Sequence, residues 1–457
     1  MKVVAEAQTA TRFEETEFPV AVDYSHTMRN THDHHEEADV TSPFRADASG
    51  NQFTRRSFLL GSLAAAGAVA LVGCSTSPGA TSSSSPTAVS GSAVAPGARA
   101  VRRITPPRLD TAYLGEKVHC YRPMRRGAPN LSADVVGDKV IAHNYGHGGS
   151  GWTLAPGSAQ YVIDLVQETE QGRAVPKDAD VTVVGAGVIG LFTAYELVQR
   201  GYTKVTVVAE KYDGLTSNNA GGLLAPVSMD NDPVMQAIID KIGIDAYKFY
   251  AAVANGMQPD FETGAVIVPA YFENREESGL EPYVGQVMEP AKDVVLDFGN
   301  GTTRDMVAYD DGIFIDTAVF MKSLHDYLAD KVTFETGKVD DLESLPSSLI
   351  FDCTGLGAGR LNGDAEMVSV QGHLVMLKDQ VPADLQSMIL VYYPKAKTTS
   401  GQEVKRSFYI FPKHLLGSGP NDVGVIGGTF IEGATPQTPN DEEFQIMIDG
   451  ARNFYGI

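Results

Sequence analysis

Beyond residue 100, short apolar runs alternate with segments of helical pattern. The run VTVV at Val181–Val184 is β-branched, which is typical of a strand buried on both faces of a parallel sheet. The segment LFTAYELVQRG that follows has the pattern of a helix ending at Gly201. The next run, KVTVVAE, predicts a second strand that ends at Glu210. This order of strand, helix and strand predicts an α/β fold.

The turn between the first strand and the helix is glycine-rich. Gly185, Gly187 and Gly190 form the pattern G-x-G-x-x-G. The first glycine allows a tight turn, the second lets a pyrophosphate approach the backbone, and the third lets the helix pack closely on the strand. Glu210 follows Gly185 by 25 residues, a suitable distance for a carboxylate that binds ribose hydroxyls. The segment therefore predicts a nucleotide-binding domain.

A second glycine-rich turn lies before the first of these strands. The stretch AHNYGHGGSGWTLAPGSA, at 142–159, follows the strand-like run KVIAHNY and opens a helix. The free N–H groups at a helix N-terminus favour negative charge, so this turn is a second candidate for contact with a cofactor.

The sequence of residues 1–100 indicates segments that lie outside the fold. A twin-arginine pair, Arg55 and Arg56, precedes an Ala/Gly-rich apolar segment that ends in LVGC at Cys74. This resembles a Tat export signal with a lipoprotein cleavage box, after which Cys74 is lipidated and tethers the protein to a membrane. The Ser/Pro/Gly-rich stretch that follows has the composition of a flexible tether. The histidines of THDHHEE, near the start, indicate a solvated run rather than a metal site.

Composition narrows the class of protein. The chain has 457 residues, 43% of them hydrophobic, which allows a sizeable core and more than one domain. The net charge of −21 argues against nucleic acid and anionic lipid surfaces as partners. Three cysteines do not make a disulfide framework, so the fold depends on its packed core.

After the acidic strand end comes the loop YDGLTSNNAGGLLAP, at 212–226, which is rich in hydroxyls, amides and glycines. Here the chain resembles the D-amino-acid oxidase family of FAD enzymes, within the glycine/sarcosine oxidase group. Later segments match the same family: TGKVDDL, SLIFDCTGLGAGRL, SVQGHLVMLK and FYIFPKHLLGSGPNDVGVIGGTF. The resemblance implies FAD as cofactor and an α/β fold with two parts. These are a Rossmann-like FAD-binding domain with a parallel sheet and an α+β substrate domain with a mostly antiparallel sheet.

The resemblance also assigns residues by matching positions. Those expected to bind the cofactor are Gly185, Gly187, Val188, Ile189, Gly190, Glu210, Lys211, Thr216, Ser217, Gly221, Gly222, Leu223, Val339, Cys353, Thr354 and Gly355, and, in the second glycine turn, Gly148, Ser150, Gly151, Trp152 and Thr153.

In this family an arginine for the substrate carboxylate and an N-Y-G-H-G-G turn normally follow a helix like DEEFQIMIDGARNFYG. In this chain the same pieces stand in front, as Arg122 in YRPMR and as the turn at 145–153. We therefore expect a circular permutation, with a truncated chain carrying a duplicated front copy as the alternative. The expected parts are an extension (1–53), the signal (54–74), the tether (75–108), the permuted C-terminal module (109–179), the FAD-binding domain (180–230 and 331–366) and the substrate domain (231–330 and 367–457).

The resemblance implies oxidative deamination of a D-amino acid by hydride transfer from Cα to flavin N5, giving a 2-oxo acid, ammonia and, with oxygen, hydrogen peroxide. Arg122 and Tyr409 are expected to bind the substrate carboxylate, and the carbonyl of Gly149 the amine. Two departures from the family pattern, Ala225 and the QGH triplet at 371–373, leave side-chain specificity open. The alternatives are a glycine- or sarcosine-type amine oxidase or dehydrogenase, a nicotinamide dehydrogenase, and an exported lipoprotein that binds a ligand without turnover.

Overall fold

The computed structural model describes residues 99–226, 229, 231–276, 278–397, 403–414 and 419–457, all within the unit Val89–Ile457. The predicted extension, the signal with Arg55, Arg56 and Cys74, and most of the predicted tether lie outside the described residues. Among the described residues, no helix combines the length and apolar character that a membrane crossing requires.

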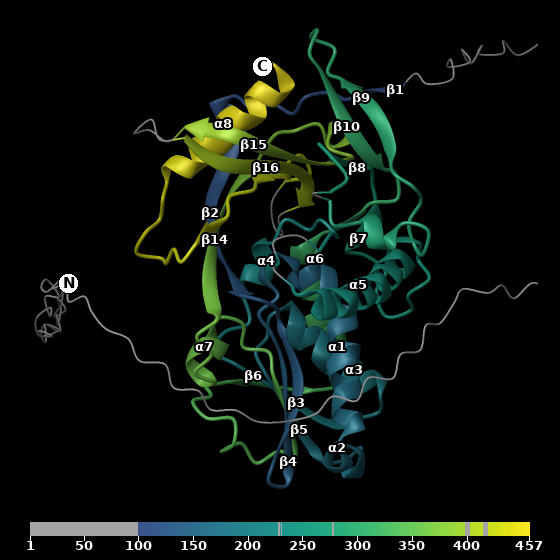
Figure 1. Ribbon diagram of the computed structural model, residues 1–457, viewed down its shortest axis with the longest axis vertical. Helices are drawn as coiled ribbons and strands as arrows, with labels where there is room; N and C mark the ends of the chain where they lie inside the picture. The colour runs from purple at the N-terminus through teal and green to yellow at the C-terminus, as the bar shows by residue number, and fades with distance from the viewer. Residues whose placement is uncertain (1–98, 227–228, 230, 277, 398–402, 415–418) are drawn as a thin grey trace, which may run out of the picture. The chain divides into compact units, whose positions relative to one another are not determined.

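A six-stranded sheet carries the nucleotide motif (Figure 1). Its strands, in spatial order, are β12 (Thr333–Thr336), β6 (Lys204–Ala209), β5 (Asp180–Val184), β13 (Leu349–Asp352), β4 (Lys139–Tyr145) and β3 (Asn130–Val136). All neighbours are parallel except β3 and β4, which form an antiparallel pair. The central strands β5 and β13 are buried along nearly their whole length, as their β-branched and aromatic side chains predict.

Two helices lie against one face of this sheet, and a third packs on them. α1 (Gly151–Glu168) packs against both α3 (Val188–Gln199) and α5 (Pro233–Ala254), and their apolar side chains share one core with β5 and β6. A smaller apolar cluster, with Ile141, Val184, Leu342 and Ile350, covers the opposite face. The carboxyl ends of β5, β6, β13 and β4 therefore meet at one edge between two cores, which is where ligands bind in open α/β sheets.

A second, mostly antiparallel sheet of ten strands forms the other part of the fold (Figure 1). Its strands are β1 (Ala100–Arg103), β9 (Lys292–Asp297), β10 (Thr303–Tyr309), β8 (Ala270–Phe272), β15 (Met388–Lys397), β16 (Glu403–His414), β17 (Val423–Gly427), β14 (Met367–Leu377) and β18 (Ile431–Glu432), with β2 (Leu114–Arg125) paired to β14. The amphipathic helix α8 (Glu442–Tyr455) packs on β14–β17.

Shorter elements complete the fold. These are the strand pair β7 (Ala265–Ile267) and β11 (Ile313–Ile315) and the helices α2 (Glu170–Ala174), α4 (Thr216–Asn219), α6 (Thr317–Leu328) and α7 (Gly357–Leu361). Single 3-10 turns occur at Thr111–Tyr113, Gly148–Ser150, Glu281–Tyr283 and Pro382–Asp384.

The predicted fold class is confirmed, with a parallel Rossmann-like sheet and a mostly antiparallel second sheet. Two segments are more ordered than their composition suggests. Residues 100–103, expected within the tether, pair in parallel with β9. The polar segment before β5 contains the short helix α2, whose first turn is capped by the side chain of Thr169.

Candidate active site

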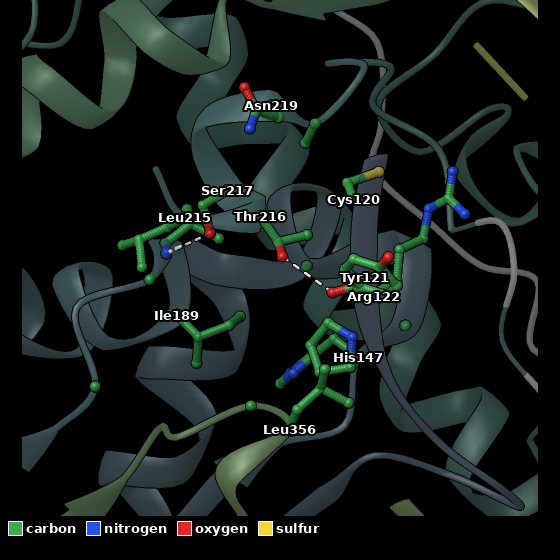
Figure 2. A pocket seen from close by; sticks show the side chains of 18 of the residues that line it. Cys120, Tyr121, Arg122, His147, Ile189, Leu215, Thr216, Ser217, Asn219 and Leu356 are labelled. Carbon is green, nitrogen blue, oxygen red and sulfur yellow. Dashed lines mark hydrogen bonds between the residues drawn. The ribbon is translucent and has the colours of Figure 1, made fainter. Parts of the chain in front are cut away.

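A cavity of about 1060 Å³ opens at the carboxyl edge of the parallel sheet and continues to the antiparallel sheet. This volume is at the upper end of the range for small-molecule sites. Figure 2 shows Thr216 and Ser217 at one wall and His147 and Leu356 at the opposite wall in this view, while Arg122 and Cys120 project from their strand away from His147.

The G-x-G-x-x-G turn follows β5 and opens α3. Gly185 has a φ of +112°, and a Cβ there would lie 2.4 Å from the carbonyl oxygen of Cys353. A Cβ on Gly190 would lie 1.9 Å from the carbonyl oxygen of Gly185. Any larger residue at either position would therefore collide with backbone, so the glycines keep strand, turn and helix close together.

The loop after β6 forms the facing wall. Ser217 Oγ accepts a hydrogen bond of 3.0 Å from the backbone N–H of Val188, in the first turn of α3. The indole N–H of Trp152 donates to the carbonyl of Ser217 at 2.9 Å. Gly222 has a φ of +95°, and its carbonyl accepts from the N–H of Ile315 at 2.7 Å. Contacts with three separate elements thus fix this loop.

A buried lysine holds the end of the same loop. The ammonium of Lys413, on β16, donates to the carbonyl of Ala220 at 2.9 Å and to Thr317 Oγ1 at 2.7 Å. The single hydroxyl hydrogen of Thr317 is shared between the carbonyl oxygens of Asn218 and Ala220, each 3.1 Å from Oγ1. Burial lowers the pKa of Lys413 to about 8, an effect that Asp316 partly offsets.

The second glycine turn joins β4 to α1 and contributes another wall. Gly148, Gly149, Gly151 and Trp152 line the cavity at the start of an 18-residue helix, where backbone N–H groups favour negative charge. His147 is buried beside them, and its Nε2 has no hydrogen-bond partner in the described part of the protein. Burial lowers the pKa of His147 to about 4, so the ring is neutral at pH 7.

These observations fit a bound dinucleotide such as FAD. Two helix N-termini, those of α3 and α1, meet the cavity, and both suit anionic groups. Glu210 and Lys211 line it beyond β6, where a ribose carboxylate partner is expected. The ring of His147, neutral at pH 7, lies beside the turn that opens α1 and so adds no positive charge to this wall.

The end of the cavity at the antiparallel sheet has different chemistry. Tyr409 stacks on Phe411, with ring centroids 4.2 Å apart, and its strand neighbour Leu390 lines the same wall. Arg122 lies close enough to interact with the Tyr409 hydroxyl. A guanidinium beside a phenol provides donors that match a carboxylate.

The structure places most of the predicted site residues around this one cavity. Those that line it are Arg122, Gly148, Gly149, Gly151, Trp152, Gly185, Gly187, Val188, Ile189, Glu210, Lys211, Thr216, Ser217, Gly221, Gly222, Leu223, Val339, Cys353, Thr354, Gly355 and Tyr409. Gly190, Ser150 and Thr153 do not line it. The hydroxyl of Thr153, expected as a donor into the cavity, instead donates to the carbonyl of Ala225 at 2.9 Å and accepts from its N–H at 3.1 Å.

Other lining residues were missed by the sequence analysis. His147 belongs to the quoted glycine turn, and as a titratable side chain between two glycines it could have been singled out. Thr429 and Phe430 lie just after β17, and Leu356 lies in the turn before α7. All three lie in segments that match the family, but the sequence analysis assigned them no role.

Comparisons with known proteins agree with this geometry. Residues 180–456 match the family described as DAO, FAD dependent oxidoreductase. The chain is 29% identical over 229 residues to a D-amino-acid oxidase from Streptomyces coelicolor, a match covering 48% of this chain and 67% of the relative. It is 25% identical over 218 residues to a D-aspartate oxidase from Homo sapiens, covering 44% of this chain and 60% of the relative.

Two solved structures are also similar. The glycine oxidase from Bacillus cereus superposes with a TM-score of 0.41 at 15% identity, over 60% of this chain and 77% of the other. The glycine oxidase from Geobacillus kaustophilus gives a TM-score of 0.42 at 17% identity, over 60% and 80%. Because the family match spans more than half of the sequence and contains the nucleotide motif, this chain belongs to the DAO family of FAD-dependent oxidoreductases.

Proposed function

We propose that the protein oxidatively deaminates neutral D-amino acids, giving a 2-oxo acid, ammonia and hydrogen peroxide. The observation that carries the proposal is the pair Arg122 and Tyr409 at the end of the cavity opposite the nucleotide motif. The two relatives named as oxidases of D-amino acid and D-aspartate support the choice of chirality.

The chain's own residues bind and orient the substrate. Arg122 donates hydrogen bonds to the carboxylate, and the Tyr409 hydroxyl is a second donor. Together they fix the orientation of Cα. The carbonyl of Gly149, in the second glycine turn, accepts a hydrogen bond from the amine. FAD, when bound, would supply the acceptor for the hydrogen and electron pair that leave the Cα–H bond, and the carbon–nitrogen bond becomes that of an imine.

The walls beside Tyr409 support a neutral side chain on the substrate. Leu390 and Phe411 are apolar, and Cys120 is buried on the same strand face as Arg122. His119, a second basic group at this end, is paired with Asp441 at 3.0 Å. A second carboxylate on the substrate would therefore meet apolar surface instead of a free cation.

Turnover of a substrate panel tests the proposal. Purified protein should bleach its flavin absorbance with D-alanine or D-methionine under anaerobic conditions, and release hydrogen peroxide in air. D-aspartate and the L-enantiomers should react much more slowly. Faster reaction with glycine or sarcosine would instead indicate a glycine- or sarcosine-type amine oxidase. Turnover with an artificial electron acceptor that releases no hydrogen peroxide would indicate a dehydrogenase. Flavin that no amine reduces would indicate ligand binding without turnover.

We further propose that the chain is circularly permuted, with 109–179 taking the place of the usual C-terminal module. The pairing of β4 with β13 and of β2 with β14 supports this, as does the 2.7 Å bond from Arg452, near the end of α8, to the carbonyl of Leu109. Moving residues 109–179 behind Ile457 through a short linker should preserve flavin binding. Loss of flavin in that variant would favour the duplication alternative.

Export and lipidation form a separate proposal, which rests on the sequence of the N-terminal segment alone. Replacing Arg55 and Arg56 by lysine should retain the protein in the cytoplasm, and Cys74→Ser should release it from membranes. Unchanged fractionation of both variants would contradict the proposal.

A further inference from the structure

The QGH triplet at 371–373, which departs from the family pattern, lies on β14 beside the strand that carries Arg122. In the antiparallel pair of β2 and β14, Gly372 stands opposite Cys120 and His373 opposite His119. A Cβ on Gly372 would lie 2.5 Å from Nη2 of Arg122, so a larger residue there would displace the guanidinium. The triplet is therefore part of the arginine's surroundings.

His373 uses both ring nitrogens. Its Nε2 lies 2.9 Å from the carbonyl oxygen of Pro439, and its Nδ1 lies 2.7 Å from Thr429 Oγ1. A carbonyl only accepts, so Nε2 carries the proton and Nδ1 is the acceptor. The backbone N–H of His373 also donates to Thr429 Oγ1 at 2.8 Å. The hydroxyl of Thr429 thus accepts from the backbone of His373 and donates to its ring.

Thr429 connects this histidine to the arginine. The Thr429 side chain is 1% exposed, and its carbonyl accepts a 2.9 Å hydrogen bond from Nη1 of Arg122. Thr429 follows the glycine pair at 427–428, a stretch that has little conformational restraint of its own. The contacts with His373 add to the restraint from strand pairing, in which Gly427 stands opposite Leu374 and Tyr409.

We propose that His373 is a positioning residue for substrate binding: through Thr429 it holds the carbonyl that orients the Arg122 guanidinium toward the carboxylate. The inference rests on the proposed function, because it takes Arg122 as the carboxylate site. Gln371 has a different task. It donates to the carbonyls of Thr438 and Pro439 at 3.1 and 3.3 Å, and so holds the segment before α8.

The arrangement requires a neutral imidazole. Protonation at Nδ1 would make it a donor and leave the Thr429 hydroxyl without its acceptor. Burial lowers the pKa of His373, and its backbone contact with Pro439 partly offsets this.

The charged groups around His373 come from three elements. His119 on β2 has its ring centroid 5.0 Å from that of His373 and pairs with Asp441. Glu443 on α8 pairs with Arg406 on β16, with Arg406 Nε donating at 2.6 Å. Glu443 and Asp441 raise the pKa of His373, but burial, the largest effect, lowers it, so carboxylate binding should weaken only as the pH falls below the ordinary histidine range.

Two substitutions separate the two ring contacts. The amide oxygen of asparagine occupies approximately the position of Nδ1, so His373→Asn keeps the acceptor for Thr429 and loses the Pro439 contact. Glutamine reaches the position of Nε2, so His373→Gln keeps the Pro439 contact and loses the one to Thr429. The holoenzymes are titrated with propionate, a carboxylate without an amine, and binding is followed by flavin absorbance. KM and kcat for D-alanine are measured in parallel.

We expect His373→Gln to raise the propionate Kd and the KM about three- to tenfold, with kcat nearly unchanged, as for loss of one hydrogen bond. His373→Asn should stay close to wild type. Wild-type binding by both variants, or weakened binding in the asparagine variant alone, would overturn the proposal, since the latter pattern assigns the effect to the segment before α8.

Thr429→Val provides a second test that leaves the histidine in place. It should raise the propionate Kd by a similar factor, remove the loss of binding at acid pH, and make His373→Gln silent in the double variant. Unchanged binding by Thr429→Val contradicts the inference. If wild type itself neither binds propionate nor is reduced by any D-amino acid, the proposed function fails. If wild type binds and every variant matches it, only the role of His373 fails.

Discussion

Arg122 and Tyr409 line the same cavity, although their strands β2 and β16 stand near opposite ends of the described chain. Burial raises the pKa of Tyr409, and the nearby Arg122 partly offsets this, so the phenol stays protonated at neutral pH and can donate. Both groups are supported from behind, Arg122 by Thr429 and the Tyr409 ring by its stacked neighbour Phe411.

Arg122→Lys should weaken substrate binding while leaving the cofactor site intact. A lysine keeps the charge but loses the planar pair of donors. We expect the KM for a D-amino acid to rise about 10- to 100-fold, the range for loss of a charge-assisted hydrogen bond, with unchanged flavin content. Steady-state kinetics at matched flavin loading measures this. A wild-type KM in the lysine variant would show that the carboxylate binds elsewhere.

Gly427→Ala should displace the Tyr409 ring. A Cβ at Gly427 would lie 2.3 Å from Cζ of Tyr409, and a Cβ at Gly221 would lie 2.9 Å from its hydroxyl oxygen. The alanine methyl at 427 would therefore push the ring from its place, and we expect kcat/KM to fall at least about tenfold. In a Tyr409→Ala background the same change should be nearly neutral, which a double-mutant cycle measures. Additive losses in the cycle would contradict the steric account.

Gly190→Ala tests how the nucleotide turn is built. Its Cβ would lie 1.9 Å from the carbonyl oxygen of Gly185, so helix α3 must shift away from β5. We expect loss of bound flavin and a fall in unfolding free energy of about 1–3 kcal/mol, typical of overpacking. The flavin-to-protein absorbance ratio and urea unfolding measure the two effects. Retention of full flavin at wild-type stability would contradict the observed packing.

The titration of Lys413 should make the free energy of unfolding depend on pH above about pH 8. Its pKa is lowered to about 8 in the folded protein, mainly by burial, against about 10.4 in an unfolded chain. The folded state therefore binds fewer protons between these values, and its stability rises with pH across that window by up to about 1.4 kcal/mol per pH unit. Below about pH 8 both states are charged, and the full cost of the buried ammonium is present.

The comparison with Lys413→Met isolates this effect. Urea unfolding from pH 7 to 10 should show the wild type gaining stability relative to the methionine variant as the pH rises. Lys413→Arg, which stays charged, serves as the control and should show no such gain. Parallel pH curves for wild type and Lys413→Met would mean that Lys413 titrates normally.

Much of the parallel sheet was predictable from local sequence. The run KVIAHNY coincides with β4, and VTVV lies within β5, because buried parallel strands consist of short continuous apolar runs. The roles of Gly185, Gly187 and Gly190 could be predicted from the backbone geometry that such a turn requires. The cavity residues found by matching positions, Arg122 and Tyr409 among them, depended on resemblance to a family and not on spacing.

What escaped prediction depends on contacts between distant segments. The hydroxyl of Thr153 bonds to Ala225, and the chain from His373 through Thr429 to Arg122 requires the register of β2, β14 and β17 together. Register between strands far apart in sequence is fixed by packing, which a single sequence does not display. The strand at Ala100–Arg103 was missed for the same reason, since pairing with β9 orders it.

Anaerobic reduction of the bound flavin by D-alanine tests the central claim most directly. Purified protein should carry FAD, and its visible absorbance should bleach on addition of D-alanine, with pyruvate and ammonia formed in equal amounts and with much slower bleaching in Arg122→Lys. A yellow protein whose absorbance is unchanged by D-amino acids, glycine and sarcosine alike would contradict the account.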